Sequence, residues 1–348
     1  MISVSALTLG SNTPSARFRV RQFLPALAEL GVHVEESYPA GLPAARLPAG
    51  AAQRRLQIAA RLARSTAGRF GEAIATWRAD VTWLSKQLVV GVPTWERALH
   101  RPLVLDVDDA MWLARPLGEV AARSAARAAA AIVAGNGFLA EWYGQHNGNV
   151  HRVPTSVDTS RFAPRLASLP ERFVVGWTGS RATLPYLEAI EGGLNGFLES
   201  HPKARLLVIC DAPPRFAGRA RHQLDFLPWT PEAEIEGLAR VSVGIMPLPD
   251  DDMARGKCSF KMLQYMSCGL PVVVSPVGSN AEILGQGEIG WAATSSDSWV
   301  AALDACMRQP EIAARRGAAG RQLVEQEYSV ARSAQKLADI FRALAPTG

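Results

Sequence analysis

The stretch that decides the fold runs from residue 246 to residue 273 and reads MPLPDDDMARGKCSFKMLQYMSCGLPVV. It follows the nearly all-apolar segment Val241–Met246, passes through a polar loop into a run with helical periodicity, and ends in Pro271–Ser275. Gly269 lies where that helix should stop, because glycine terminates helices readily. Short, nearly all-apolar strands are typical of a parallel sheet that is covered on both faces. The stretch therefore predicts strand, loop, helix and strand, which is the repeating unit of an α/β fold.

The helix in this stretch concentrates positive charge at its start. We expect it to begin near Lys257, and residues three or four apart then share a face, which carries Lys257, Lys261, Gln264 and Cys268. The apolar residues that should pack on the sheet are Met262, Leu263 and Met266. A helix start disfavours each lysine by about 0.3–1 kcal/mol, so the cluster, with Arg255 nearby, suggests a bound anion. Cations and free backbone N–H groups together suit a diphosphate. A solvated lysine face is the alternative interpretation.

Strand and helix signals alternate through the rest of the chain. In the first half the predicted strands are Ile2–Leu9, Val81–Leu84, Leu103–Val107, Ala131–Ala134 and Val150–Val153. In the second half they are Phe173–Trp177, Arg205–Cys210, Val241–Met246 and Pro271–Ser275. Helices are expected after the first strand, ending at Gly31, and over Leu184–Ser200. Further helical stretches finish the chain, with breaks near Pro310 and Tyr328.

The length of 348 residues suits two domains of ordinary size. Pro154–Pro170 is rich in proline and is the expected connection between them. We therefore expect an N-terminal domain over 1–165 and a C-terminal domain over 166–327. The last segment, 328–348, should be a helix that crosses back to the first domain.

The composition predicts a cytoplasmic protein without a membrane span. Met1–Leu9 has no basic n-region and no cleavage site, so it is expected to be a strand rather than a signal peptide. No apolar run approaches the roughly 20 residues that a bilayer requires. The four cysteines form no CxxC pair, as in proteins with reduced thiols. The net charge of +5 fits an anionic substrate or a membrane surface and does not indicate nucleic acid.

Several segments together resemble family 4 retaining glycosyltransferases of the GT-B fold. Gly256–Val273 with Ser275–Asn280 is similar to their donor-site signature, and Phe173–Ser180 to the first strand and glycine loop of their C-terminal domain. The family's interdomain connection resembles Val153–Asp158 with Arg161 and Phe162. The ends of its N-domain strands resemble Val104–Ala110 and Ala134–Asn136. The resemblance is strong over 172–285 and loose over 1–100. It implies two Rossmann-like domains whose parallel sheets face a central cleft.

The same resemblance implies an activity. A sugar would pass from a nucleotide diphosphate sugar, with retention, to a glycan or lipid-linked acceptor in surface polysaccharide or glycoconjugate assembly. The donor and its diphosphate would be bound by Gly179, Ser180, Arg255, Lys257, Lys261 and Gln264. The family carries two glutamates where this chain has Gly256 and Gln264. Gln264 can still hydrogen-bond a ribose hydroxyl, but Gly256 cannot contact the donor sugar.

The strand Leu103–Val107 contains Asp106 and is followed by Asp108 and Asp109. Three interpretations compete beside plain solvation of a strand end: a DxD metal site, a phosphohydrolase with an aspartate nucleophile, and a GT-B strand end. We favour the last, because the donor signature fits and no complete phosphatase motif set appears. In the resemblance, Asp108 replaces the family's His and Asp109 matches its Asp. Asp108 would stabilise an oxocarbenium-like state or serve as the acceptor's base.

The six histidines show no metal-ligand spacing, so we expect no metal and no cofactor beyond the sugar nucleotide as co-substrate. A non-catalytic sugar-nucleotide-binding protein remains the other alternative.

Side chains at the remaining strand ends are candidates for acceptor or cleft contacts: Ser11, Arg17, Arg19 and Asn136. Plain surface or turn-forming roles are the competing interpretation for each. The basic segment 54–78 is expected either to form an amphipathic helix that docks on the anionic inner face of a membrane or to be a solvated helix.

Overall fold

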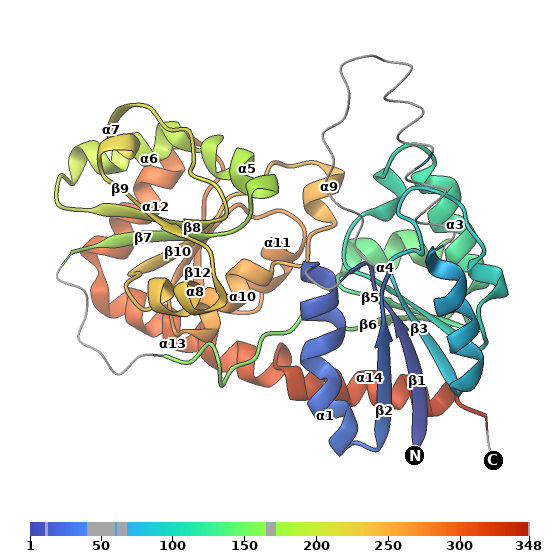
Figure 1. Ribbon diagram of the computed structural model, residues 1–348. Helices are drawn as coiled ribbons and strands as arrows, with labels where there is room; N and C mark the ends of the chain where they lie inside the picture. Colours follow the sequence, from blue (N-terminus) through green and yellow to red (C-terminus); the bar gives the residue numbers. More distant parts are fainter. Residues whose placement is uncertain (11–12, 40–59, 61–67, 165–171, 347–348) are drawn as a thin grey trace. The chain divides into compact units, whose positions relative to one another are not determined.

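The computed structural model describes residues 1–10, 13–39, 60, 68–164 and 172–346 (Figure 1). The chain divides into two compact units. The first comprises Met1–Thr155 and Val330–Gly348, and the second comprises Ser156–Ser329. In the described residues, each unit contains a six-stranded sheet in which all neighbouring strands are parallel. The α/β class expected from the sequence is confirmed.

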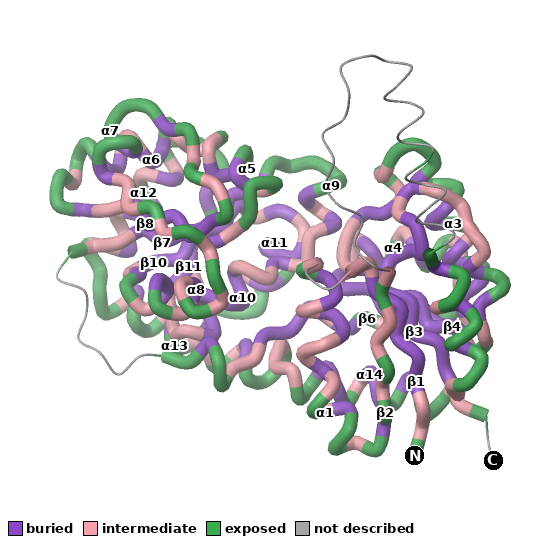
Figure 2. Tube along the Cα trace, viewed as in Figure 1, coloured by how far each residue is buried: buried purple, intermediate pink, exposed green. Residues whose placement is uncertain are grey.

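The sheet of the first unit has the strand order β2-β1-β3-β4-β5-β6. Its strands are β1 (Ile2–Leu7), β2 (Val32–Ser37), β3 (Val81–Ser85), β4 (Leu103–Val107), β5 (Ala131–Ala134) and β6 (Val150–Arg152). The helical elements include η1 (Ala16–Val20), η2 (Arg21–Phe23), α1 (Leu24–Glu29), η3 (Thr76–Arg78), η4 (Glu96–Ala98), η5 (Met111–Leu113), α3 (Gly118–Ala128), α4 (Gly137–Gly144) and α14 (Val330–Leu344). Strands β3, β4 and β5 are buried over their whole lengths (Figure 2), as their apolar sequences require.

The last helix, α14, is part of the first unit although its sequence follows the second. It packs against α1 and η2. Leu337, Ala338 and Phe341 are buried at helical spacing, and the Phe341 ring lies 5.3 Å from the ring of Trp83 on β3. Burying such an apolar stripe on the sheet is the main force that holds a terminal helix in place.

The boundary between the units lies after Thr155, ten residues before the expected one. Val157 and Phe162 are buried in the core of the second unit. Ser267 donates a hydrogen bond to the Phe162 carbonyl at 2.7 Å, and Arg321 donates to the same carbonyl at 2.9 Å. These contacts attach the connecting segment to the second unit.

The sheet of the second unit has the order β12-β11-β10-β7-β8-β9. Its strands are β7 (Val174–Thr178), β8 (Arg205–Cys210), β9 (Leu224–Pro228), β10 (Val243–Met246), β11 (Val272–Val274) and β12 (Gly290–Ala292). Its helical elements include η6 (Arg181–Thr183), α5 (Leu184–Glu188), α6 (Glu191–Ser200), α7 (Gly218–His222), α8 (Pro231–Leu238), α9 (Asp252–Arg255), α10 (Phe260–Ser267), α11 (Ser279–Leu284), α12 (Ser296–Arg308) and α13 (Pro310–Glu327).

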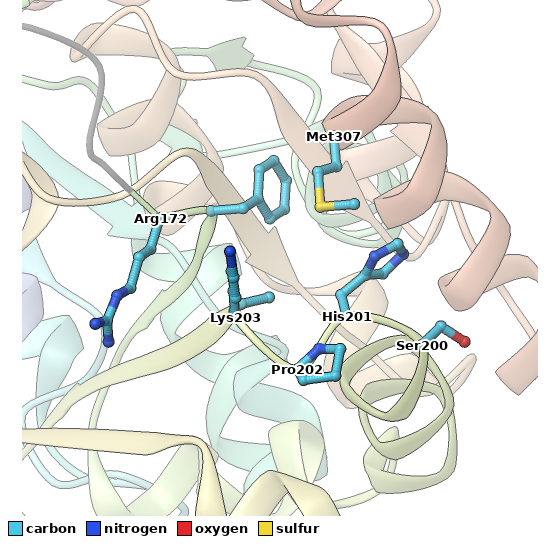
Figure 3. A pocket seen from close by; sticks show the side chains of 8 residues that line it. Arg172, Ser200, His201, Pro202, Lys203 and Met307 are labelled. Carbon is cyan, nitrogen blue, oxygen red and sulfur yellow. The ribbon is translucent and has the colours of Figure 1, made fainter.

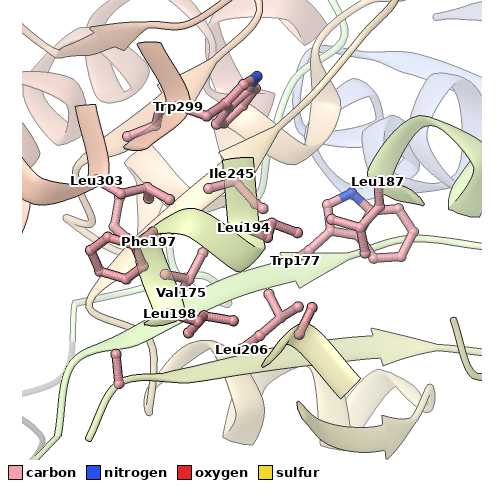
Figure 4. Packing of buried hydrophobic residues seen from close by; sticks show 14 of the residues in the cluster. Val175, Trp177, Leu187, Leu194, Phe197, Leu198, Leu206, Ile245, Trp299 and Leu303 are labelled. Carbon is pink, nitrogen blue, oxygen red and sulfur yellow. The ribbon is translucent and has the colours of Figure 1, made fainter. Parts of the chain in front are cut away.

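Helices cover both faces of this second sheet. On one face, Trp177 and its neighbours on the strands pack against Phe197 and Leu198 of α6 and against Trp299 and Leu303 of α12 (Figure 4). The other face has a separate apolar cluster, to which α8, α10, α11 and α13 contribute. The sheet is therefore closed on both faces, and its strand ends are left to carry polar chemistry.

The single helix expected over Leu184–Ser200 is instead two helices, α5 and α6, that break at Ala189–Ile190. Gly192 and Gly193 follow the break, and glycine has a weak helix propensity. A Cβ added to Gly193 would lie 2.7 Å from the Cβ of Trp299 on α12. Helix α6 therefore packs closely against α12, and the chain changes direction between α5 and α6.

Candidate functional site

The predicted donor residues gather at the carboxyl edge of the second sheet. Strands β8 and β10 are the two neighbours of β7, and all three are parallel. Their carboxyl ends therefore meet at one edge, where Gly179 and Ser180 follow β7 and the segment that leads to α10 follows β10. This is the edge at which ligands bind in open α/β sheets.

Lys261 lies at this edge, in the first turn of α10. Its Nζ is 5.6 Å from the ring centroid of Trp177, at a distance typical of a cation–π contact. Trp177 is almost completely buried in the core. A fixed aromatic ring thus places a partly exposed ammonium group beside the end of β7.

Helix α10 begins at Phe260, so the expected start near Lys257 is wrong. Ser259, just before the helix, has a left-handed backbone with φ 53°. Its buried hydroxyl donates to Asn280 Oδ1 at 2.6 Å, and the Asn280 amide donates to the carbonyls of Met246 and Ser275. These hydrogen bonds hold Ser259 outside the helix. Lys257 therefore lies in the preceding loop and not on one helix face with Lys261.

Arg255 is the least suitable of the predicted diphosphate ligands. It closes the short helix α9, which the sequence interpretation treated as loop, although Asp251 is a helix-capping residue that signals it. The Arg255 guanidinium lies 2.9 Å from Asp250 and 3.2 Å from Asp252. Two carboxylates already balance its charge, so it adds little positive potential to the sheet edge.

Gln264 is buried, with 2% of its surface exposed. Within the described part of the chain, its Nε2 has no hydrogen-bond partner. Buried amides are rarely left in that state, because an unsatisfied donor costs about 1–3 kcal/mol. The predicted packing residues Met262, Leu263 and Met266 are buried, as expected. Gln264, three residues after Lys261 on the same helix, is also buried.

The glycine loop after β7 is tightly packed. Gly179 N–H donates to the Ile209 carbonyl at 3.0 Å, and a Cβ at this position would lie 2.3 Å from the Trp177 ring. Ser180 N–H donates to Thr183 Oγ1 at 3.3 Å and so opens the turn η6. Only glycine fits between this loop and the tryptophan, which explains the residue in structural terms.

Asp211 lies at the same carboxyl edge, and the sequence interpretation did not include it. It directly follows β8, and its Oδ1 accepts a hydrogen bond from Arg181 N–H at 2.6 Å. This donor holds the pKa of Asp211 below its usual value. A polar residue directly after the apolar strand 205–210 is the signal that could have identified it.

In the first unit, Arg19 is part of the core rather than of a ligand-contacting edge, which corrects the expectation. Its guanidinium forms a buried two-point ion pair with Asp106 and also donates to the Val153 carbonyl at 2.8 Å. Burial raises the pKa of Asp106, and the Arg19 guanidinium opposes that effect. Arg17 is partly buried, and its guanidinium carbon lies 4.9 Å from the ring centroid of Phe18. Ser11 lies outside the described residues.

Asn136 caps helix α4. Its Oδ1 accepts a hydrogen bond from Leu139 N–H at 2.8 Å, and the side chain is buried. Asparagine is among the most favoured residues at a helix N-cap. The structure therefore shows the capping role of Asn136, and its predicted contact with an acceptor stays a prediction.

Asp108 and Asp109 follow β4 and share one cation. Nζ of Lys86 lies 2.9 Å from Asp108 Oδ1 and 2.6 Å from Asp109 Oδ2. Burial would lower the pKa of Lys86, but the two carboxylates outweigh it and raise the pKa overall. Lys86 directly follows β3, the neighbour of β4, so the two strand ends bring the three side chains together. The sequence interpretation did not include Lys86.

The second unit also contains a cavity of about 410 Å³, and Figure 3 shows the side chains that line it. It is lined by Arg172, Phe173, Ser200, His201, Pro202, Lys203, Ala204 and Met307. Phe173 and Ala204 directly precede β7 and β8, so the cavity is at the amino edge of the second sheet. The predicted donor residues are at the opposite edge.

Two further observations concern metals and membranes. Across the described ranges, no three His, Cys, Asp or Glu side chains gather in positions that could hold a metal ion. None of the described helices is both long enough and apolar enough to cross a bilayer.

Comparison with protein families gives a match over residues 182–309 to the family described as Glycosyl transferases group 1. The match covers a little over a third of the chain and lies entirely in the second unit. It begins just after the glycine loop and contains Asp211, Arg255, Lys261 and Gln264. Among curated protein sequences, none matches this chain.

Solved structures of glycosyltransferases match the whole chain. Sucrose-phosphate synthase from Thermosynechococcus elongatus is 14% identical with a TM-score of 0.74, and the match covers 99% of both chains. Anabaena HepE in complex with UDP-glucose is 14% identical with a TM-score of 0.71, over 99% of this chain and 100% of HepE. WaaG, a glycosyltransferase involved in lipopolysaccharide biosynthesis, is 14% identical with a TM-score of 0.63, over 97% and 99%. At these identities the similarity shows the fold, and the expected GT-B fold is confirmed.

Proposed function

We propose that this protein is a glycosyltransferase that moves a sugar, with retention, from a nucleotide diphosphate sugar to a glycan or lipid-linked acceptor. The observation that carries the proposal is the carboxyl edge of the second sheet, next to and within the segment 182–309 that matches Glycosyl transferases group 1. There the glycine loop, the start of α10 and the Lys261 ammonium lie together. We further propose that the pathway is surface polysaccharide or glycoconjugate assembly, as the sequence resemblance implies.

The donor side suits a diphosphate for electrostatic reasons. Backbone N–H groups at the start of a helix attract anions, and a lysine in the same turn adds a full charge. Placing that lysine at a helix start is unfavourable by about 0.3–1 kcal/mol without an anion, so a bound diphosphate would remove the penalty. The unpartnered Nε2 of Gln264 would gain an acceptor from the ribose or the base of the same ligand.

Uridine nucleotides are the first candidates for the donor. HepE of Anabaena was solved with UDP-glucose, and the trehalose-6-phosphate enzyme of Escherichia coli with UDP-2-fluoro glucose. Both share the fold of this chain at 14% identity or less. UDP-glucose is therefore the substrate to test first.

The carboxylates of the first unit are our candidates for the chemical step. Asp108 and Asp109 are partly exposed, whereas Asp106 is not. A retaining transfer develops positive charge on the sugar, which a fixed carboxylate stabilises. Asp108 would supply that charge or accept the proton of the acceptor hydroxyl, and the cations at the donor edge would stabilise the leaving diphosphate. We propose that this chemistry is independent of a metal ion.

A phosphohydrolase is disfavoured by the geometry of Asp106. As nucleophile, Asp106 would need an open face, but Arg19 occupies both of its oxygens in the core. A non-catalytic sugar-nucleotide-binding protein is the remaining alternative, because Gly256 and Gln264 stand where the resembling family has glutamates.

A membrane contact is a separate proposal, which rests on three exposed apolar side chains. Phe70, Ile74 and Trp77 are 64%, 56% and 65% exposed and are spaced as on one helix face. Apolar and aromatic side chains beside arginines are typical of helices that lie in the interface of an anionic bilayer. Most of the basic segment 54–78 lies outside the described residues. We propose that the protein is cytoplasmic and contacts the inner face of the membrane through this segment.

A thermal-shift panel of UDP, GDP, ADP, dTDP and their sugar conjugates tests the donor proposal. A ligand at about 100 times its Kd stabilises a protein by about 2.7 kcal/mol. The best conjugate is then incubated with and without EDTA, and the free nucleotide and the transferred sugar are measured. Transfer that survives EDTA supports the proposal. Phosphate release that requires Mg²⁺ would support the phosphohydrolase, and binding without turnover would support the non-catalytic alternative.

Sedimentation with anionic vesicles at low salt tests the membrane proposal. The triple variant Phe70→Ser/Ile74→Ser/Trp77→Ser should sediment less than the natural protein while it keeps its affinity for the nucleotide. If neither protein binds the vesicles, the membrane contact is excluded.

A further inference from the structure

Lys86 has a backbone conformation that ordinarily belongs to glycine. Its φ is 68°, and in the described part of the chain only one other non-glycine residue, Ser259, has a positive φ. For residues with a Cβ, this left-handed conformation is strained. Glycine would fit here without that strain, so the lysine side chain needs a reason of its own.

The surrounding contacts keep the backbone in this conformation. Lys86 N–H donates to the Asp106 carbonyl at 2.7 Å, which continues the pairing of β3 with β4. The next residue, Gln87, is buried and accepts a hydrogen bond from Gly91 N–H at 2.8 Å. Strain of this kind persists where the structure over-determines it, and it is common at functional sites.

The side chain of Lys86 lies beneath the two acids. Lys86 is 8% exposed, whereas the Asp108 and Asp109 side chains are 17% and 25% exposed. Both carboxylates contact the same ammonium, at 2.9 Å and 2.6 Å. The two carboxylates are therefore more accessible than the lysine that contacts both of them.

Two neighbouring carboxylates without a cation would repel each other, and one would tend to take up a proton. A shared ammonium compensates for one of the two charges and fixes both side chains in one orientation. The other nearby carboxylate, Asp106, is paired with Arg19, whereas Lys86 contacts Asp108 and Asp109.

We propose that Lys86 is a positioning residue for glycosyl transfer, which holds the Asp108 and Asp109 carboxylates charged and oriented without touching the substrate. This inference rests on the proposed function, because it assigns Lys86 to the same reaction. A hydrogen bond to a charged group contributes about 1.5–3 kcal/mol, so loss of the ammonium should lower kcat by about 10–100-fold.

The left-handed backbone makes Lys86→Gly the sharpest test. Glycine relieves the strain and removes the whole side chain, so the protein should remain folded with a Tm close to that of the natural protein. We expect kcat to fall and the KM for the sugar nucleotide to stay within about twofold, since the donor residues are in the other unit. n-Butylamine, which replaces the missing side chain, should restore part of kcat in Lys86→Gly. The uncharged n-butanol should not, and neither should change the natural enzyme.

Lys86→Met is the matched control, because it keeps an unbranched side chain of nearly the same length and the strained backbone but lacks the charge. It should lose the same activity and resist rescue, because methionine fills the space that the amine needs. Should Lys86→Gly fail to fold, the kcat of Lys86→Met against that of Lys86→Arg, which retains the charge, decides the question.

The outcomes separate the two proposals. If the natural enzyme is active and Lys86→Gly or Lys86→Met has the same kcat, the positioning role of Lys86 is overturned. The transferase proposal then remains intact. A loss of kcat that n-butanol restores as well as n-butylamine also overturns it, because charge would then be irrelevant. A natural enzyme that transfers no sugar from any nucleotide overturns both.

Discussion

Arg19 and Asp106 form a two-point ion pair in the core of the first unit. Nε of Arg19 lies 2.8 Å from Oδ1 of Asp106, Nη2 lies 3.0 Å from Oδ2, and each side chain is 1% exposed. The Arg19 guanidinium also donates to the carbonyl of Val153, the residue that follows β6, and so links that residue to the ion pair. The pair thus fixes the end of β4, from which Asp108 and Asp109 continue.

Breaking this pair from one side should destabilise the protein strongly. Removal of one partner leaves a buried charge without compensation, which costs about 3–5 kcal/mol. We expect Arg19→Met and Asp106→Asn each to lower the free energy of unfolding by about that amount in urea denaturation. The double variant Arg19→Met/Asp106→Leu, which removes both charges, should lose less than either. Single variants within 1 kcal/mol of the natural protein would show that the pair contributes little.

Asp108→Asn should have the opposite profile, with a loss of activity and little loss of stability. Asparagine has the same shape but lacks the charge and the basicity that we assign to Asp108. General base catalysis contributes about 10²–10⁴-fold, so kcat should fall within that range. Sugar transfer and urea denaturation are measured on the same preparation. Turnover equal to that of the natural enzyme would exclude Asp108 from the chemical step.

The strands that the sequence predicted best are those buried on both faces. β4, β5 and β8 have the predicted bounds, because nearly all-apolar runs of this length are typical of strands covered on both faces. The strands it missed, β2, β9 and β12, are at or next to sheet edges and are only partly buried. β2 reads VHVEES, and its polar residues give no apolar run that marks it as a strand.

Candidate site residues could be predicted where a single strand end shows them in the sequence. They could not be predicted where two segments that are distant in the sequence come together in the fold. Asp108 and Asp109 are visible in the sequence because they follow an apolar strand. Lys86 becomes significant only because β3 and β4 are neighbours, which the sequence does not state. The start of α10 was wrong for a similar reason: Asn280, 21 residues further along the chain, holds Ser259 and breaks the helix.

Lys261 should contribute more to nucleotide binding than Arg255. Loss of a charged hydrogen bond to the diphosphate costs about 1.5–3 kcal/mol, so Lys261→Met should raise the Kd of the nucleoside diphosphate by about 10–100-fold. Arg255 is already engaged by Asp250 and Asp252 at an exposed site, and Arg255→Ala should raise the Kd less than about fivefold. Isothermal titration calorimetry at fixed salt compares the two. A larger effect of Arg255→Ala would move the diphosphate away from α10.

Gly179→Ala should damage both the stability of the second unit and its affinity for nucleotide. The new Cβ would lie 2.3 Å from the Trp177 ring and 2.9 Å from Thr183 Oγ1. The buried ring has no room to retreat, and overpacking of this kind costs about 1–3 kcal/mol. Displacement of Trp177 would also move Lys261, so the Kd for nucleotide should rise. Gly148→Ala is the matched control, since nothing lies within 4 Å of its Cβ. Equal melting temperatures of the two variants would contradict the prediction.

Asp80 should give the first unit a stabilisation that disappears in acid. Ser3 N–H and the Ser3 hydroxyl donate to Oδ2 of Asp80 at 2.8 Å and 2.9 Å, and they hold the pKa of Asp80 below its usual value. A carboxyl whose pKa is lower in the folded state stabilises the fold above its unfolded pKa of about 3.9, and the effect is lost as the pH falls through the folded pKa. Asp80→Asn should therefore be less stable than the natural protein at pH 7, and the difference should shrink below about pH 4. Urea denaturation across this range measures it. Ser3→Ala, which keeps the backbone donor, should show a smaller difference in the same window, and a difference that does not change with pH would refute the role of the charge.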